Sequence, residues 1–403
     1  MEFERAREKQ KFVKQVTDQE TLPQPEESND SAAKEPEWEE EVWEERFGDH
    51  TDPNRRGPMA IALDVGFPGA QEAYGLAEHT TPLALPTTRG QNPLNPNQKS
   101  YTEPYRMYNL DVFEYDLDTP AAIYGAVPLL HALRSGGRVA SAFWMNAAET
   151  WVDVTKQPLL ESPSRSVQID SHWMSETGVI DLFLFPGPDF QTNLDAYTQI
   201  TGRPMLPPMF SVAYHQCRWN YNDQKDVQHV DQTFDLHAIP YDVLWLDIEH
   251  TDGKRYWTWD LSKFPDPTDM QLDLGRKGRK MVTIVDPHIK IDEDYAVYAE
   301  AKKRGLFVKN ADGQSDFDGW CWPGGSSYID FLNPESMKFI EERYKFGTHP
   351  HATEFLHIWN DMNEPSVFNG PEITMQKDLM HYGGWEHRDV HNLYGFLYVY
   401  RLY

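Results

Sequence analysis

Tyr241-Asp242-Val243-Leu244-Trp245-Leu246-Asp247 is an apolar run that ends in a carboxylate, and it belongs to a set of runs that decides the fold. The other three runs end in polar residues as well and cover residues 209–215, 281–286 and 355–361. Nearly continuous apolar runs are typical of strands that are buried on both faces, as in parallel sheets. The four runs therefore predict four strands of one parallel sheet.

Helical patterns separate the four runs along the chain. Val227, Val230 and Phe234 have the spacing of one helix face. Asn333-Pro334 is typical of a helix start, with Asn as the N-cap and Pro at the first helical position. An order of strand, helix, strand and helix favours a parallel sheet whose strands are joined by helices.

The spacing of the runs fits units of one strand and one helix. Their ends at residues 214, 247, 286 and 361 lie 33, 39 and 75 residues apart, so the third gap predicts an insertion near residues 290–326. A TIM barrel and a doubly wound sheet both carry their chemistry at the carboxyl ends of the strands. The sequence lacks a Gly-rich phosphate loop, which disfavours the doubly wound sheet. We predict an α/β fold in which residues 207–403 form the first half of a (β/α)8 TIM barrel, incomplete because four units are not eight.

An all-β domain is expected before the barrel, at residues 57–206. Joints rich in Gly, Pro and Asn separate short predicted strands, as is typical of an antiparallel β-sandwich. These strands cover residues 60–65, 106–115, 140–146, 150–154 and 178–185, and residues 86–104 are expected to form a long loop. Residues 1–56 are rich in Glu, Lys, Gln, Pro and Ser, so we expect an acidic, poorly ordered segment there.

The charge and the composition exclude several classes of function. The chain has 64 acidic and 37 basic residues and a net charge of −27, so it should repel nucleic acid and anionic membranes. It has no apolar run of eighteen residues, so no membrane insertion is expected. Two cysteines, Cys217 and Cys321, exclude a disulfide scaffold and leave open whether they pair. The 13% of aromatic residues suits sugar binding, and it equally suits ordinary core packing.

The end of the fourth run carries the residues of greatest chemical interest. Trp359-Asn360-Asp361-Met362-Asn363-Glu364 places two carboxylates just after a buried strand. Glycoside hydrolysis needs such groups, because one carboxylate attacks or stabilises an oxocarbenium-like carbon and a second carboxyl protonates the leaving oxygen. Asp and Glu three residues apart also occur in turns and helix caps. From the residues alone, both interpretations stay open.

This motif resembles the nucleophile signature of glycoside hydrolase family 31. The resemblance runs from about Gly57 to Tyr394 and includes the stretches at residues 146–153, 368–372 and 381–392. It implies a retaining exo-α-glucosidase that removes terminal α-linked glucose, with Asp361 as the catalytic nucleophile. It implies sugar-binding roles for Asp247, Ile248, Ile284, Trp322, Trp359 and Met362, with Tyr221 at the rim and Asp111 on a loop from the sandwich.

The remaining polar residues near the strand ends are interpreted as supporting groups. Asp286-Pro287-His288 is expected to be structural, and since no third ligand accompanies it, no metal site is predicted. Glu364 and Asp330 are expected to be supporting or turn residues, and Cys321 is expected to be packed. The resemblance implies no cofactor.

The family's general acid/base belongs to a later barrel strand, and this sequence has no position that matches it. We therefore expect a fragment or a truncated product that is inactive alone, because proton donation contributes about 10²–10⁴-fold. A non-catalytic relative that binds carbohydrate or a partner is the alternative. The resemblance further implies N-glycan processing in the endoplasmic reticulum lumen, beside a non-catalytic β-subunit. The visible sequence has no signal peptide, which leaves the cytoplasm open.

Overall fold

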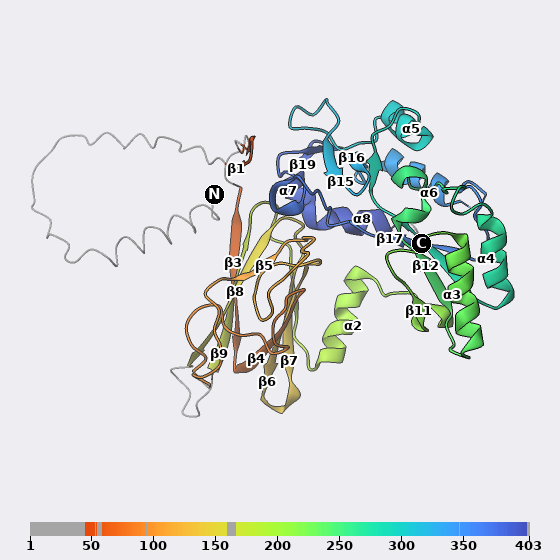
Figure 1. The fold of residues 1–403 in the computed structure, drawn as a ribbon. Coiled ribbons are helices and arrows are strands. Elements are labelled where there is room, and N and C mark those ends of the chain that lie inside the picture. The colour runs from red at the N-terminus through yellow and green to blue at the C-terminus, as the bar shows by residue number, and fades with distance from the viewer. Residues whose placement is uncertain are drawn as a thin grey trace, which may run out of the picture.

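The computed structural model describes residues 45–52, 54, 59–93, 95–158, 167–345 and 347–400. Figure 1 shows a β-sandwich that is followed by helix α2 (Phe190–Thr201) and then by a region of alternating strands and helices. The predicted fold class is confirmed, since an all-β N-terminal domain precedes part of a barrel whose sheet is open.

The sandwich consists of two antiparallel four-stranded sheets. The first has the order β3-β9-β8-β5 and the second β10-β7-β6-β4. The strands are β3 (Ile61–Pro68), β4 (Ala70–Ala77), β5 (Tyr105–Met107), β6 (Val127–Arg134), β7 (Val139–Trp144), β8 (Thr150–Pro158), β9 (Val167–Ser175) and β10 (Leu182–Phe185). Alternate side chains of both sheets meet in one core, where Trp144 and Trp173 are fully buried and stack at 6.1 Å. This alternation is the expected pattern of packed sheets.

Two of the predicted strands are shorter than expected. The strand predicted over residues 106–115 is β5, which ends at Met107, and the one predicted from residue 178 begins only at Leu182. Residues 108–112 instead leave the sheet as a loop, because the backbone N–H of Asn109 bonds to the side chain of Asn392 rather than to a strand. Residues 86–104 contain no helix or strand among those described, as predicted for a loop.

Most of the predicted disordered segment, residues 1–44, lies outside the described residues. Within residues 45–52 the expectation is wrong, because β1 (Glu45–Phe47) and β2 (His50–Asp52) pair as an antiparallel hairpin. Asp52 is buried and binds the guanidinium of Arg388 at 2.6 Å. That ion pair anchors the hairpin, and the composition of the segment gave no sign of it.

The barrel region is built on a parallel sheet with the order β11-β12-β13-β17. Its strands are β11 (His215–Gln216), β12 (Val243–Leu246), β13 (Lys280–Val285) and β17 (Leu356–Asn360). The connecting helices are α3 (Gln224–Leu236), α4 (Pro267–Arg276) and α6 (Pro334–Tyr344). Figure 1 shows α3 and α4 side by side along the sheet. Val227 of α3 and Leu274 of α4 bury their side chains with Leu244 and Met281 of the sheet.

Local sequence signals explain how these helices begin. Asp223 caps α3 by accepting a hydrogen bond from the backbone N–H of Asp226 at 2.8 Å. Asn333 caps α6, and Pro334 occupies the first helical position, as predicted. Val227 is buried, and Val230 and Phe234 pack against the same core, so the predicted helix face is confirmed.

The strand predicted over residues 209–215 is largely wrong. Residues Met209–Val212 form a 3-10 helix, and only His215–Gln216 pairs with β12. The carbonyl of Pro208 accepts hydrogen bonds from both the backbone N–H and the hydroxyl of Ser211, at 3.0 and 2.8 Å. These bonds close a turn where the apolar pattern indicated a strand.

A long excursion separates β13 from α6. It contains β14 (His288–Lys290), α5 (Ala296–Arg304), β15 (Asp318–Cys321) and β16 (Gly324–Tyr328), and its strands form an antiparallel sheet. After β17 come β18 (Met380–His381), β19 (Trp385–Glu386), α7 (His387–Val390) and α8 (Tyr394–Tyr400). In Figure 1, α7 lies against the end of the sandwich.

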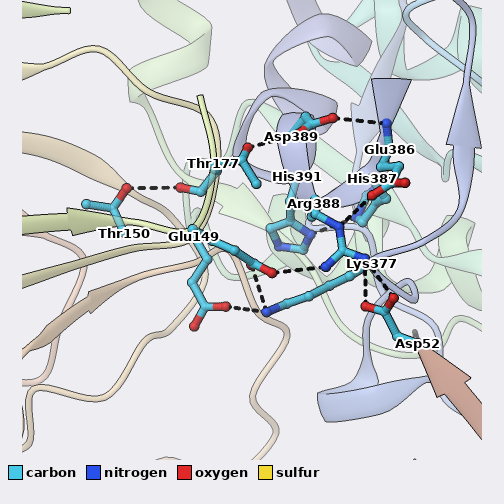
Figure 2. Close-up of polar contacts among 12 residues, drawn as sticks. Asp52, Glu149, Thr150, Thr177, Lys377, Glu386, His387, Arg388, Asp389 and His391 are labelled. Carbon is cyan, nitrogen blue, oxygen red and sulfur yellow. Dashed lines mark hydrogen bonds and ion pairs between the residues drawn. The ribbon is translucent and has the colours of Figure 1, made fainter. Parts of the chain in front are cut away.

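Buried charges join the sandwich to the segment that contains α7, as Figure 2 shows. Arg388 binds Asp52 and also Glu176 of the sandwich, the latter at 3.1 Å, and Lys377 binds Glu149 at 2.7 Å. Removing one partner of such a buried pair typically costs about 3–5 kcal/mol, because it leaves the other charge without compensation. The two domains are therefore held in a defined relation. No helix among the described residues is long and apolar enough to cross a membrane.

Candidate active site

Three carboxylates follow three neighbouring strands at the same edge of the parallel sheet. Asp247, Asp286 and Asp361 come directly after β12, β13 and β17. The register pairs Val285 with Asn360, so β13 and β17 end level, and it pairs Leu246 with Thr283, so β12 ends two residues earlier at the same edge. Parallel strands end at a common edge, which is where barrel enzymes carry their reactive groups.

The charges of these groups act on one another. Burial raises the pKa of Asp361, and the carboxylates of Asp111 and Asp247 raise it further, against a hydrogen bond from the backbone of Met362 that lowers it. Burial also raises the pKa of Asp247, although the backbone N–H of Ile248 donates to its carboxylate at 2.6 Å. Carboxylates that repel one another in a buried place favour any positive charge that approaches them.

Asp111 reaches the site from the sandwich domain. Its side chain is 8% exposed, and the hydroxyl of Ser366 donates a hydrogen bond to it at 3.0 Å. Burial raises the pKa of Asp111, and the bond from Ser366 lowers it. Ser366 lies five residues after Asp361, so one loop carries both the candidate nucleophile and the group that holds Asp111. Sequence reasoning missed Ser366, since a single Ser in a loop gives no signal.

Glu364 belongs to the same group of carboxylates. Its side chain is buried, and burial together with the charges of Asp111 and Asp361 raises its pKa to about 7. Its Oε2 atom has no hydrogen-bond partner among the described residues. Glu364 does lie in a turn, as predicted, yet it is buried and the charges of Asp111 and Asp361 act on its carboxyl. Its place three residues after Asp361 was the available sequence signal.

Asp286 is the most deeply buried of these carboxylates. It is fully buried, and burial raises its pKa well above the ordinary value. The hydroxyl of Tyr256 donates to Asp286 and lies 3.0 Å from Nε2 of His288. Among the described residues, no three His, Cys, Asp or Glu side chains are placed to hold a metal ion.

The predicted apolar lining residues are found at the same strand ends. Ile248, Ile284 and Met362 are 4–6% exposed, and they follow or end β12, β13 and β17. Met362 adopts a left-handed backbone conformation with φ of 58°, which turns the chain immediately after Asp361. These residues give the carboxylates a poorly hydrated surround, which is the cause of their raised pKa values.

The predicted aromatic residues differ in exposure. Trp359 lies beside Trp245, with ring centroids 5.2 Å apart. Trp322 follows β15 in the excursion, is 44% exposed and meets the edge of Phe368 at 4.7 Å. Its exposed face is available to a ligand. Tyr221 is only 2% exposed and belongs to the core below the sheet edge, so it offers little surface at a rim.

The structure describes two free thiols, and a cavity that lies apart from the clustered carboxylates. Cys217 and Cys321 are both free, and Cys321 is buried as expected for a packed residue. A cavity of about 450 Å³ lies between the segment at residues 252–258, α5 and residues 348–350. None of the clustered carboxylates lines this cavity, so it is separate from the candidate site.

Comparison with known protein families gives two matches that together span most of the chain. The family model described as "Glycosyl hydrolases family 31 TIM-barrel domain" matches residues 204–403. The model described as "Glycosyl hydrolase 31 N-terminal galactose mutarotase-like domain" matches residues 2–153.

Individual relatives agree with these matches. The chain is 53% identical over 359 residues to neutral alpha-glucosidase AB of Dictyostelium discoideum, covering 89% of this chain and 37% of the relative. It is 50% identical to neutral alpha-glucosidase AB of Homo sapiens, covering 89% of this chain and 38% of the relative. It is 48% identical to the human neutral alpha-glucosidase C, with 88% and 39% covered. The chain thus spans less than two fifths of the length of these relatives.

Solved structures resemble the fold closely. A crystal structure of the glucosidase II alpha subunit, in its alpha3-Glc2-bound form, has a TM-score of 0.85 and 47% identity. The match covers 90% of this chain and 39% of that one. A family 31 alpha-glucosidase from Bacteroides thetaiotaomicron has a TM-score of 0.67 and 26% identity, with 84% and 51% covered.

Proposed function

Because this chain belongs to glycoside hydrolase family 31, we propose that it carries the nucleophile of a retaining α-glucosidase, with Asp361 attacking the anomeric carbon of a terminal α-linked glucose. The supporting observation is the position of Asp361 directly after β17, where its charge interacts with those of Asp111, Asp247 and Glu364. No other part of the described chain gathers carboxylates at the carboxyl ends of parallel strands.

The chemistry of glycoside cleavage matches this electrostatic environment. Positive charge develops on the sugar ring in an oxocarbenium-like transition state, while the substrate itself is neutral. A group of buried carboxylates therefore stabilises the transition state more than the ground state, which is the requirement for catalysis. Asp361 then forms a covalent glucosyl intermediate, which splits the displacement into two steps and retains the configuration.

The other predicted residues take binding roles in this proposal. Asp247 and Asp111 accept hydrogen bonds from sugar hydroxyls. Trp322 and Trp359 wall the sugar, and a ring face suits the C–H-rich face of a pyranose. The remaining lining residues are Ile248, Ile284 and Met362, whereas Tyr221 is buried in the core and takes no contact role here. We assign the proton-donating role to none of the described residues.

The relatives suggest the substrate and the partner of the longer protein. Solved glucosidase II alpha subunits have been crystallised with alpha3-Glc2 and with Glc1Man2. One was solved as an ER heterodimer of the catalytic subunit and the binding domain of the regulatory subunit. By similarity, we propose that the protein trims glucose from N-linked glycans in the endoplasmic reticulum lumen, beside a non-catalytic β-subunit.

An aryl α-glucoside tests the role of Asp361. A good leaving group needs little help from an acid, so the purified chain should release the phenolate in a burst and gain one hexose on the peptide that contains Asp361. Asp361→Asn should abolish the burst, and Asp64→Asn, on the surface of β3, should leave it unchanged. A label on another peptide would refute the assignment.

Protection experiments distinguish the hydrolase from the alternative, a protein that binds carbohydrate without cleaving it. If glucose protects the chain against proteolysis and no burst occurs, the chain binds sugar without turnover. Absence of both effects would overturn the proposed function for this chain.

A further inference from the structure

Three histidines and one aspartate form an unbroken line of hydrogen bonds beneath the candidate site. Nδ1 of His381 lies 2.8 Å from Oδ1 of Asp330, and its Nε2 lies 2.9 Å from Nδ1 of His387. Nε2 of His387 lies 2.8 Å from Nδ1 of His391, whose Nε2 lies 2.7 Å from the carbonyl oxygen of Asn109. The three histidines and Asp330 are at most 4% exposed.

The two ends of this line accept hydrogen bonds and cannot donate them. A backbone carbonyl has no hydrogen to give, and an ionised carboxylate has none either. Starting from Asn109, His391 must donate through Nε2, so its Nδ1 accepts from His387. His387 in turn must accept at Nδ1 from Nε2 of His381. Three neutral imidazoles supply three N–H hydrogens, whereas the line contains four bonds.

The fourth bond, between His381 and Asp330, therefore requires one more proton. Without it, the lone pair of His381 Nδ1 would face a carboxylate oxygen at 2.8 Å in a buried place. The backbone N–H groups of Leu332 and Tyr382 also donate to Asp330, at 3.1 and 2.6 Å. Such bonds favour the ionised carboxylate, so the extra proton belongs to His381.

The surroundings keep the other two rings neutral. Burial, with the charges of His391, His381 and Arg388, lowers the pKa of His387 well below its ordinary value. Burial lowers the pKa of His391 to about 3, against an opposing bond to the Asn109 carbonyl. The other charged groups that act on His391 are Glu149, Lys377 and Arg106.

The far end of the line holds the loop that carries Asp111. Besides the bond from His391, the side chain of Asn392 accepts from the backbone N–H of Asn109 at 2.9 Å. The ring of Tyr108 stacks on that of His391 at 3.8 Å. In Figure 2, His387 of α7 and His391 directly after it lie beside the sandwich. Two residues further on, Asp111 meets Ser366.

We propose that Asp330, His381, His387 and His391 form a chain that holds a single extra proton on His381, and that this chain positions Asp111 at the sugar site. The proton count stands by itself, whereas the effect on Asp111 rests on the proposed function. The four residues are positioning residues, because none of them touches the substrate.

Ring nitrogen spectra of the ¹⁵N-histidine-labelled chain test the proton count. At neutral pH, His381 should show two protonated nitrogens, and His387 and His391 one each, at Nε2. Asp330→Asn supplies an amide hydrogen to Nδ1, so His381 should become neutral in this variant. Asp64→Asn, which alters a similar pair with His172 in the sandwich, should leave these three rings unchanged. A neutral His381 in the unaltered chain, or no change in Asp330→Asn, would overturn the proton count.

Two substitutions at His391 test the positioning of Asp111. Gln can both accept from His387 and donate to the Asn109 carbonyl, whereas Asn is too short to do both. The affinity for an aryl α-glucoside should fall about tenfold or more in His391→Asn, as for a lost bond to a charged group, and stay within about twofold in His391→Gln. Equal affinities would overturn the positioning role.

If His391→Asn does not fold, His387→Asn and His387→Gln give the same comparison, because only Gln is long enough both to accept from His381 and to donate to His391. An affinity that is equal in these two variants would overturn the positioning role. If the unaltered chain neither binds nor cleaves the glucoside, the proposed function fails and the positioning role falls with it, whereas the spectra still decide the proton count.

Discussion

Replacing Glu364 with Gln should change how the stability of the protein depends on pH. Glu364 is 8% exposed, and its pKa is raised from an ordinary 4.5 to about 7 by burial first and by the charges of Asp111 and Asp361. The folded protein therefore keeps the Glu364 proton to a higher pH than the unfolded chain does. Gln carries no such proton.

The sign and the size of the effect follow from proton linkage. Between pH 4.5 and about 7 the unfolded chain binds fewer protons at this position than the folded protein. The contribution of Glu364 is complete below pH 4.5 and is lost as the pH rises through about 7. Because a tenfold change in proton affinity is worth about 1.4 kcal/mol, the loss is about 3 kcal/mol. As the pH rises from 4.5 to above about 7, the free energy of unfolding of Glu364→Gln should therefore increase by this amount relative to that of the unaltered protein.

Urea unfolding followed by tryptophan fluorescence measures this difference. Both proteins are compared at several values between about pH 4 and pH 8, because the titratable groups far from Glu364 contribute the same background to each. Glu341→Gln, on the exposed face of α6, is the control and should run parallel to the unaltered protein. A constant difference between Glu364→Gln and the unaltered protein across this range would refute the reasoning.

Three further substitutions have defined outcomes. Gly275→Ala in α4 should lower the free energy of unfolding by about 1–3 kcal/mol, because the added Cβ would overlap the ring of Phe355. This overlap outweighs the gain in helix propensity of about 1 kcal/mol, and a variant that is more stable in urea unfolding would contradict the prediction. Asp223→Ala removes the N-cap of α3 and should cost about 1 kcal/mol in the same assay, whereas Asp223→Asn should retain most of the stability, and equal losses would speak against the cap. Ser366→Ala removes the bond that lowers the pKa of Asp111, so the pH at which the affinity for an aryl α-glucoside rises should move upward, and an unchanged pH profile would exclude this influence.

The parts of the fold that depend on local chemistry were predicted from the sequence. The runs that end at Asp247 and Asp361 are strands because they are largely apolar, although β17 is only partly buried where β12 is almost fully buried. Asn333 caps a helix, as its position indicates. The run from residue 209 failed, since periodicity does not distinguish a buried strand from an apolar turn. Only the hydrogen bonds of Ser211 to Pro208 decide between the two.

The candidate site was predictable where its residues share one motif. Asp361 and Glu364 stand together in the sequence, so their motif drew attention to both. Asp111 and Ser366 bind each other although 255 positions separate them in the sequence, and Asp330 and His381 do so at a separation of 51 positions. Contacts of this kind depend on how the domains pack, and one sequence contains no local trace of them.

The loop at residues 108–111 belongs to the sandwich but ends at the sheet edge of the barrel. The two domains therefore cannot be exchanged independently, since a foreign sandwich grafted onto this barrel would bring its own loop and its own acidic group. Protein engineers can use the same dependence in reverse. Under the proposed function, changes to residues 108–112 would alter sugar binding from outside the barrel, without disturbing the strand that precedes Asp361.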